Sequence, residues 1–112
     1  MKKQTQVKIK RIRISAQKLR LIADMVRGQD LAYSIEMLSF VNKKGAKIMQ
    51  KALKSAAANL SDLYGLDASS AVVAEVMVGE GVTYKRGRVA SRGRSAPILK
   101  RTSQINLLVQ EK

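Results

Sequence analysis

The fold is decided by a basic stretch, residues 83–97, which reads TYKRGRVASRGRSAP. It has almost no apolar side chains to bury, and its cations repel one another; they are Lys85, Arg86, Arg88, Arg92 and Arg94. A connection this long without structure of its own is unusual inside a domain and usually indicates function or disorder. On either side lie Val72–Val78 and Ile98–Val109, which show the alternation typical of β-strands. The sequence therefore predicts a long basic β-hairpin at about residues 79–98.

The alternation also predicts which side chains of these two strands share a face. In the first strand one face is expected to carry Val72, Ala74, Val76 and Val78, and the other Val73, Glu75 and Met77. In the second strand Ile105, Leu107 and Val109 are expected to alternate with Asn106, Leu108 and Gln110. The two strands are interpreted as antiparallel partners in one sheet.

The rest of the chain supplies another strand and three helices. Val7–Ile14 alternates apolar and basic residues, with a change of parity between Ile9 and Ile12 that indicates a bulge or bend. Ser15 is a suitable N-cap for a first helix that stops at Gly28, and Asp30 for a second. A third helix is expected between Asn42 and Gly65, with apolar residues on one face and a lysine stripe on another.

These elements predict an α+β fold, a three-stranded antiparallel sheet packed on three helices with a long protruding basic β-hairpin. A chain of 112 residues suits one domain, spanning residues 1–112. Only 4% of the residues are aromatic, so the core is expected to be aliphatic.

The net charge of +14 points to a polyanionic partner. Seven of the eight acidic residues lie between Asp24 and Glu80, so both the N-terminal segment and the hairpin are strongly basic. Nucleic acid is the leading candidate, and an anionic membrane surface is the second. Arginine dominates the hairpin, and its guanidinium group binds phosphate with two parallel hydrogen bonds and stacks on bases.

Composition argues against an enzyme, a cofactor or a metal site. The chain has no cysteine and no histidine, which removes thiolate ligands and the commonest general base. The carboxylates form no cluster with acid-base or metal-ligand spacing, and Gly79-Glu80-Gly81 lacks the helix that a phosphate-binding loop requires. No signal peptide or membrane span is recognised, so no membrane association and a cytoplasmic location are expected.

Three blocks of the sequence carry a family resemblance. They are Ile14-Ser15-Ala16-Gln17-Lys18-Leu19-Arg20-Leu21-Ile22-Ala23, Lys54-Ser55-Ala56-Ala57-Ala58-Asn59 with Gly65-Leu66-Asp67, and Lys85-Arg86, Arg92-Gly93-Arg94 with Ile98-Leu99-Lys100-Arg101-Thr102-Ser103. In this order and spacing, across nearly the whole chain, they resemble bacterial-type ribosomal protein number twenty-two of the large subunit. The hairpin tip departs from the family pattern at Val89 and Ala90, as does Gln104 after Thr102-Ser103.

The resemblance implies a structural constituent of the large ribosomal subunit that binds and organises rRNA and aids assembly. It implies a body docked near the exit of the peptide tunnel and a hairpin in the tunnel wall. Its implied partners are large-subunit rRNA, neighbouring ribosomal proteins and the nascent peptide, and outside the ribosome we expect a monomer. The residues expected to contact rRNA are Lys8, Lys10, Arg11, Arg13, Ser15, Lys18, Lys85, Arg86, Arg88, Arg92, Arg94, Lys100, Arg101, Thr102 and Ser103. The residues expected to line the tunnel are Arg88, Val89, Ala90, Ser91 and Arg92.

Other interpretations of these residues stay open. Lysines on an edge strand also prevent aggregation, lysines on a helix are often only solvated, and Ser15 is a helix cap. Thr102 and Ser103 suit phosphate contacts or simply a strand. The alternative function is a free-standing nucleic-acid-binding protein, although the first helix offers few base-reading side chains. A membrane-surface protein would need a helix with larger apolar side chains than the alanine-rich third helix.

Overall fold

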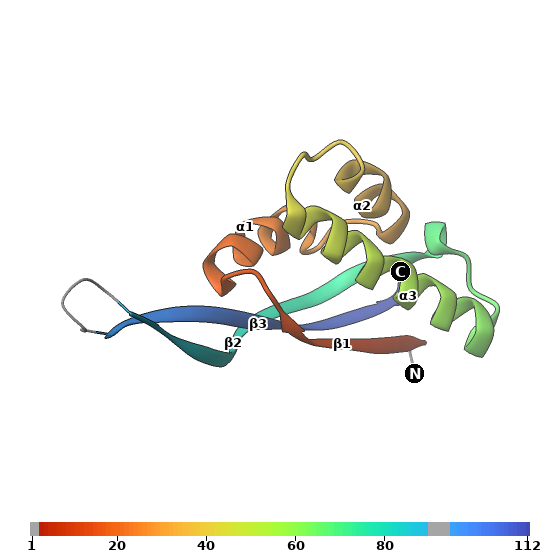
Figure 1. The fold of residues 1–112 in the computed structure, drawn as a ribbon. Helices are drawn as coiled ribbons and strands as arrows, with labels where there is room; N and C mark the ends of the chain where they lie inside the picture. The colour runs from red at the N-terminus through yellow and green to blue at the C-terminus, as the bar shows by residue number, and fades with distance from the viewer. Residues whose placement is uncertain (1–2, 90–94) are drawn as a thin grey trace.

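A computed structural model describes the backbone of residues 3–89 and 95–112, and the side chains of residues 3–81 and 101–112. In chain order the elements are β1 (Gln4–Ile12), α1 (Ala16–Val26), α2 (Leu31–Leu38), α3 (Lys44–Tyr64), a short 3-10 helix (Ala68–Ser70), β2 (Ala71–Val89) and β3 (Ser95–Glu111). The helices lie on one side of the sheet, and β2 and β3 continue past it as a hairpin (Figure 1). The predicted α+β fold is confirmed.

The helix ends follow the local chemistry of the sequence. Ser15 is the N-cap of α1, and its hydroxyl accepts a hydrogen bond from the backbone N–H of Lys18 at 3.4 Å. Gly28 and Gly65, which follow α1 and α3, have φ angles of 80° and 66°, the left-handed conformation that ends a helix. Asp30 is the N-cap residue of α2, but its side chain makes no cap hydrogen bond and lies 3.3 Å from the ammonium group of Lys112.

The three strands are antiparallel and lie in the order β1-β3-β2. β3 is therefore the central strand, and its residues Ile105, Leu107 and Val109, which were predicted to share a face, are all buried. β1 begins at Gln4 rather than Val7. The register of β1 against β3 shifts between Ile9 and Ile12, which confirms the predicted bend.

The prediction for the two faces of β2 is wrong at its start. Val73 is fully buried, whereas Val72 is only half-buried and lies on the opposite face. The cause is a register shift between Val73 and Glu75, where the extra residue Ala74 reverses the alternation. Val76 is buried after the shift. Such a bulge is set by pairing with β3, so the alternation of β2 alone does not reveal it.

The core is aliphatic and lies between the helices and one face of the sheet. Its largest fully buried side chains include Leu19, Ile22, Met49, Leu53 and Leu60 from the helices and Ile105, Leu107 and Val109 from β3. The first turn of α3 lies in direct contact with α1: a Cβ atom added to Gly45 would lie only 3.2 Å from Cδ2 of Leu19. Glycine at this position lets the first turn of α3 pack against α1.

The hairpin makes the molecule elongated. Beyond a second register shift between Glu80 and Thr83, β2 and β3 pair only with each other, from Thr83 with Arg101 to Val89 with Ser95. We call these two paired segments, residues 83–89 and 95–101, the arm. The radius of gyration is 17.2 Å and the longest dimension is 62 Å. A compact domain of this length would have a radius of gyration of about 13 Å.

Candidate nucleic-acid interface

Four exposed cations lie at the C-terminal end of β1 and just after it. They are Lys8, Lys10, Arg11 and Arg13. Within the part of the chain that the structure describes, none of them forms an ion pair with a carboxylate. A cation without such a partner is available to a phosphate, so these four residues stay candidates for rRNA contact.

The bend in β1 separates these cations from the core. Arg11 has a φ angle of 59°, an uncommon conformation for a residue with a side chain. Its neighbour Ile12 and then Ile14 are buried, with 5% and 9% of their surface exposed. Because Arg11 and Arg13 alternate with two anchored isoleucines, both guanidinium groups are held on the outer surface.

The start of α1 borders a groove with a volume of about 480 Å³. Its lining includes Arg13, Ser15 and Lys18, which the sequence singled out. It also includes Lys43 and Lys44 at the start of α3, which were not among the predicted rRNA contacts. Lys43 belongs to the lysine stripe predicted for the third helix, whereas Lys44 lies outside that stripe. Only the packing of α3 against α1 brings the two lysines to Ser15.

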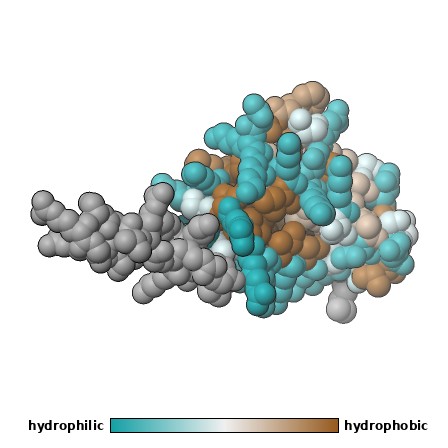
Figure 2. Space-filling model, in the orientation of Figure 1, coloured by the Kyte–Doolittle hydropathy of each residue, from teal (hydrophilic) through white to brown (hydrophobic). Residues whose placement is uncertain are grey.

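Long hydrophilic side chains surround an apolar area on the face that α3 and β1 present (Figure 2). The cations of α1 closest to the sheet have a structural role instead. Nε of Arg20 donates a hydrogen bond to the carbonyl of Val78 at 3.3 Å, and Nη2 of Arg27 donates one to the carbonyl of Val76 at 2.7 Å. These two arginines fasten α1 to β2, and Arg27 also pairs with Asp24.

Thr102 and Ser103, both predicted rRNA contacts, lie inside the body. Thr102 is 3% exposed and Ser103 is fully buried. The hydroxyl of Ser103 donates a hydrogen bond to the carbonyl of Ile14 at 2.7 Å, which joins β3 to the segment before α1. This arrangement supports the alternative that both are structural residues of the strand. Arg101, the arm residue directly before Thr102, is exposed.

The remaining predicted contacts lie on the arm or beyond it. Lys85, Arg86, Arg88 and Val89 are in β2, and Lys100 is in β3. Ala90, Ser91, Arg92 and Arg94 lie outside the described residues. The backbone of the arm therefore brings the first set onto two paired strands, as the hairpin prediction required.

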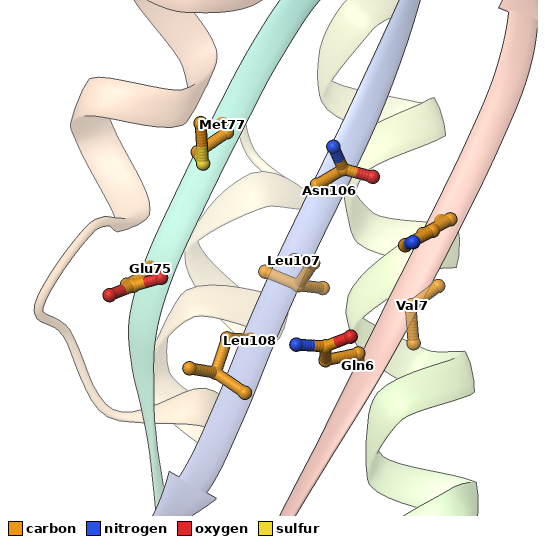
Figure 3. A pocket seen from close by; sticks show the side chains of 8 residues that line it. Gln6, Val7, Glu75, Met77, Asn106, Leu107 and Leu108 are labelled. Atoms are coloured by element: carbon orange, nitrogen blue, oxygen red, sulfur yellow. The ribbon is translucent and has the colours of Figure 1, made fainter.

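The sheet face that the helices leave uncovered holds a shallow hollow of about 200 Å³. Figure 3 shows that its side chains come from all three strands and include Gln6, Glu75, Met77 and Asn106. It holds the carboxylate of Glu75 and the ammonium group of Lys8 among amide, thioether and aliphatic groups. The hollow lacks the paired groups that acid-base or nucleophilic catalysis requires.

Among the described residues, no group of three or more Asp or Glu side chains is placed to hold a metal ion. In the same part of the chain, no helix is both long and apolar enough to cross a bilayer.

Comparison with known proteins identifies the family. Residues 7–110 match the family model described as ribosomal protein L22p/L17e. The chain belongs to this family. It is 44% identical over 103 residues to the large ribosomal subunit protein uL22 of Lacticaseibacillus casei, an alignment covering 92% of this chain and 88% of that protein. It is 40% identical over 107 residues to uL22 of Pediococcus pentosaceus, with 96% and 91% covered.

Membership in the L22p/L17e family makes the protein a structural constituent of the large ribosomal subunit and not an enzyme. As a ribosomal protein it is located in the cytoplasm, in the ribosome. The matched range of the L22p/L17e model begins in β1 and ends in β3, so it includes the groove and the whole hairpin. The resemblance seen in the sequence is confirmed.

Proposed function

We propose that the protein binds large-subunit rRNA through the end of β1, the start of α1 and the arm, and so organises that RNA during assembly. The observation that carries the proposal is a set of four exposed cations without a carboxylate partner among the described residues: Lys8, Lys10, Arg11 and Arg13. Together with the net charge of +14, they supply the sequence-independent attraction to phosphates that dominates RNA affinity.

The arm has a separate part in this proposal. Its two strands pair only with each other, and a two-stranded ribbon is marginally stable in water. Phosphates on both sides of the arm would neutralise its arginines and stabilise the pairing. We propose that the arm passes between segments of rRNA and that its tip, residues 88–92, lines the peptide exit tunnel and meets the nascent peptide.

In this proposal residues 1–112 form a single RNA-binding domain. Outside the ribosome the protein is a monomer, and in the ribosome its body contacts neighbouring ribosomal proteins. The single aliphatic core of the described body supports the assignment of one domain.

A salt-dependent binding measurement tests the RNA contact. The variant Lys10→Gln/Arg13→Gln is compared with Lys51→Gln/Lys54→Gln, which removes the same charge from exposed positions on α3. We expect the first variant to bind full-length large-subunit rRNA more weakly and to flatten the slope of log K against log salt by about 1 to 2. Equal slopes for the two variants would contradict the contact at β1.

Two measurements in the ribosome complete the test. The protein is expected to sediment with large subunits in moderate salt and to leave them only in high salt. Recovery in the soluble fraction at moderate salt would favour a free-standing nucleic-acid binder.

A photo-crosslinking amino acid at position 90 is expected to react with a stalled nascent peptide. Crosslinks from that position to rRNA alone would contradict the tunnel assignment.

A further inference from the structure

The groove between the starts of α1 and α3 combines two surfaces of different chemistry. Its rim carries four cations, Arg13, Lys18, Lys43 and Lys44. Its walls are apolar and are formed by Ile14, Leu21 and Ile22. Its lining contains no acidic residue. A partner that fills the groove must therefore be anionic at its rim and flat or apolar in its interior.

The position of the cations is set by tight packing. A Cβ atom on Gly45 would lie 3.2 Å from Leu19, 3.4 Å from Ile22 and 4.0 Å from Ile14, so the first turn of α3 is pressed against α1 and the segment before it. Lys43 and Lys44 directly precede that contact. The two lysines are thus held beside the start of α1 by the core and do not depend on a mobile loop.

Two further observations make the groove an open site. Lys43 is the N-cap residue of α3, and because its ammonium group can only donate hydrogen bonds, the positive end of the helix has no acceptor from its cap side chain. Leu21, in the wall of the groove, is 57% exposed, so much of its apolar surface is open to a partner. Covering that apolar surface would be favourable for the partner that fills the groove.

We propose that this groove receives one unpaired nucleotide of the large-subunit rRNA. Lys43 and Lys44, with Lys18, hold its phosphate, and its base lies against Leu21 and Ile14. A volume of about 480 Å³ is within the range of small-molecule sites. Duplex RNA presents phosphates and grooves but no free base face, whereas unpaired bases can be splayed out onto protein surfaces. The inference rests on the proposed rRNA binding and adds a specific site to it.

The two halves of the site have different signatures in a salt titration with full-length large-subunit rRNA. The variant Lys43→Gln/Lys44→Gln should flatten the slope of log K against log salt by about 0.7 for one phosphate on a single strand. The variant Leu21→Ser should leave the slope unchanged and lower the affinity about fivefold at every salt concentration, because it removes an uncharged contact with a base. Leu21 is exposed, so this change does not disturb the core.

Matched controls separate the groove from general effects. Lys51→Gln/Lys54→Gln removes the same charge from α3, and Leu63→Ser removes an apolar side chain that is 66% exposed. Both controls should bind with higher affinity than the corresponding groove variants, and thermal melts of all four should agree with the wild type. Failure of the wild-type protein to bind rRNA would instead reject the proposed function.

Chemical probing of the RNA locates the site. In the wild-type complex one unpaired nucleotide should be protected at both its base and its backbone, and Leu21→Ser should expose the base while the backbone stays protected. The inference is overturned if both groove variants bind and protect rRNA as the wild type does, because the groove would then take another occupant, such as an acidic protein segment. It is also overturned if Leu21→Ser matches Leu63→Ser in affinity.

Discussion

Replacement of Gly81 by alanine tests the joint between the body and the arm. A Cβ atom at this position would lie 2.7 Å from Oγ1 of Thr102, 3.4 Å from the carbonyl carbon of Thr102 and 3.5 Å from the backbone nitrogen of Ser103. Thr102 is 3% exposed, so its hydroxyl has no solvent to move into. The added methyl group must therefore displace either the Thr102 side chain or the backbone of β3.

The magnitude follows from two opposing terms. Overpacking of a close-packed site typically costs about 1–3 kcal/mol. Alanine also reduces the conformational entropy of the unfolded chain, which returns about 0.4–1 kcal/mol. We therefore expect Gly81→Ala to lower the free energy of unfolding by about 1–2 kcal/mol and the melting temperature by about 4–8 °C.

Urea unfolding followed by circular dichroism provides the measurement. Gly79→Ala is the matched control, because the three atoms nearest to a Cβ atom there all belong to the Gln104 side chain, with Nε2 the nearest at 3.3 Å. The half-buried Gln104 side chain can move, so the control should be near neutral. Adding Thr102→Ala to Gly81→Ala should cost less than the sum of the two single changes, since it removes the atom that the methyl group meets. Additive effects, or equal stability of the two alanine variants, would refute the steric argument.

Three further predictions concern the same body and arm. Ser103→Ala should destabilise the protein by about 1–3 kcal/mol in urea unfolding, because it leaves the buried carbonyl of Ile14 without its hydroxyl donor; an unchanged unfolding midpoint would contradict this. Ser34→Ala should instead stabilise by about 1 kcal/mol, since the buried Ser34 hydroxyl finds no hydrogen-bond partner among the described residues; a lower melting temperature would show a partner in solution. In the free protein, amide hydrogens of the arm should exchange faster than those of the strand pairs around Leu107, because an isolated ribbon is marginal in water; hydrogen-exchange mass spectrometry showing equal protection would contradict the proposal that RNA stabilises the arm.

The local signals of the sequence were sufficient for most of the fold. Ser15 caps α1, Gly28 and Gly65 end helices in the left-handed conformation, and the parity change after Ile9 marks a real bend. Each of these features depends on the conformational preference of one residue or on the spacing of near neighbours. They could therefore be predicted without knowing which helices and strands pack against these segments.

The errors arose where pairing or packing between distant segments decides the outcome. The bulge at Ala74 depends on the register against β3, so alternation placed Val72 on the face of Val76, whereas Val73 is the residue buried together with Val76. Ser103 has the composition of a phosphate contact, yet its hydroxyl bonds to Ile14, which is 89 positions away in the chain. The sequence does not distinguish a serine that faces solvent from one whose hydroxyl donates a hydrogen bond to a buried carbonyl group.

The sequence by itself determined the chemistry of this protein. Its charge, its separation of cations from acids and the arginine-rich stretch between two alternating strands already predicted a basic hairpin on a small aliphatic body. Only the tertiary structure decided which cations lie together. The close contact of Gly45 with α1 places Lys43 and Lys44 beside Ser15, and the contact between Gly81 and Thr102 sets where the arm leaves the body. Both contacts join residues far apart in the chain, and steric fit of that kind is a property of packed surfaces and not of local sequence.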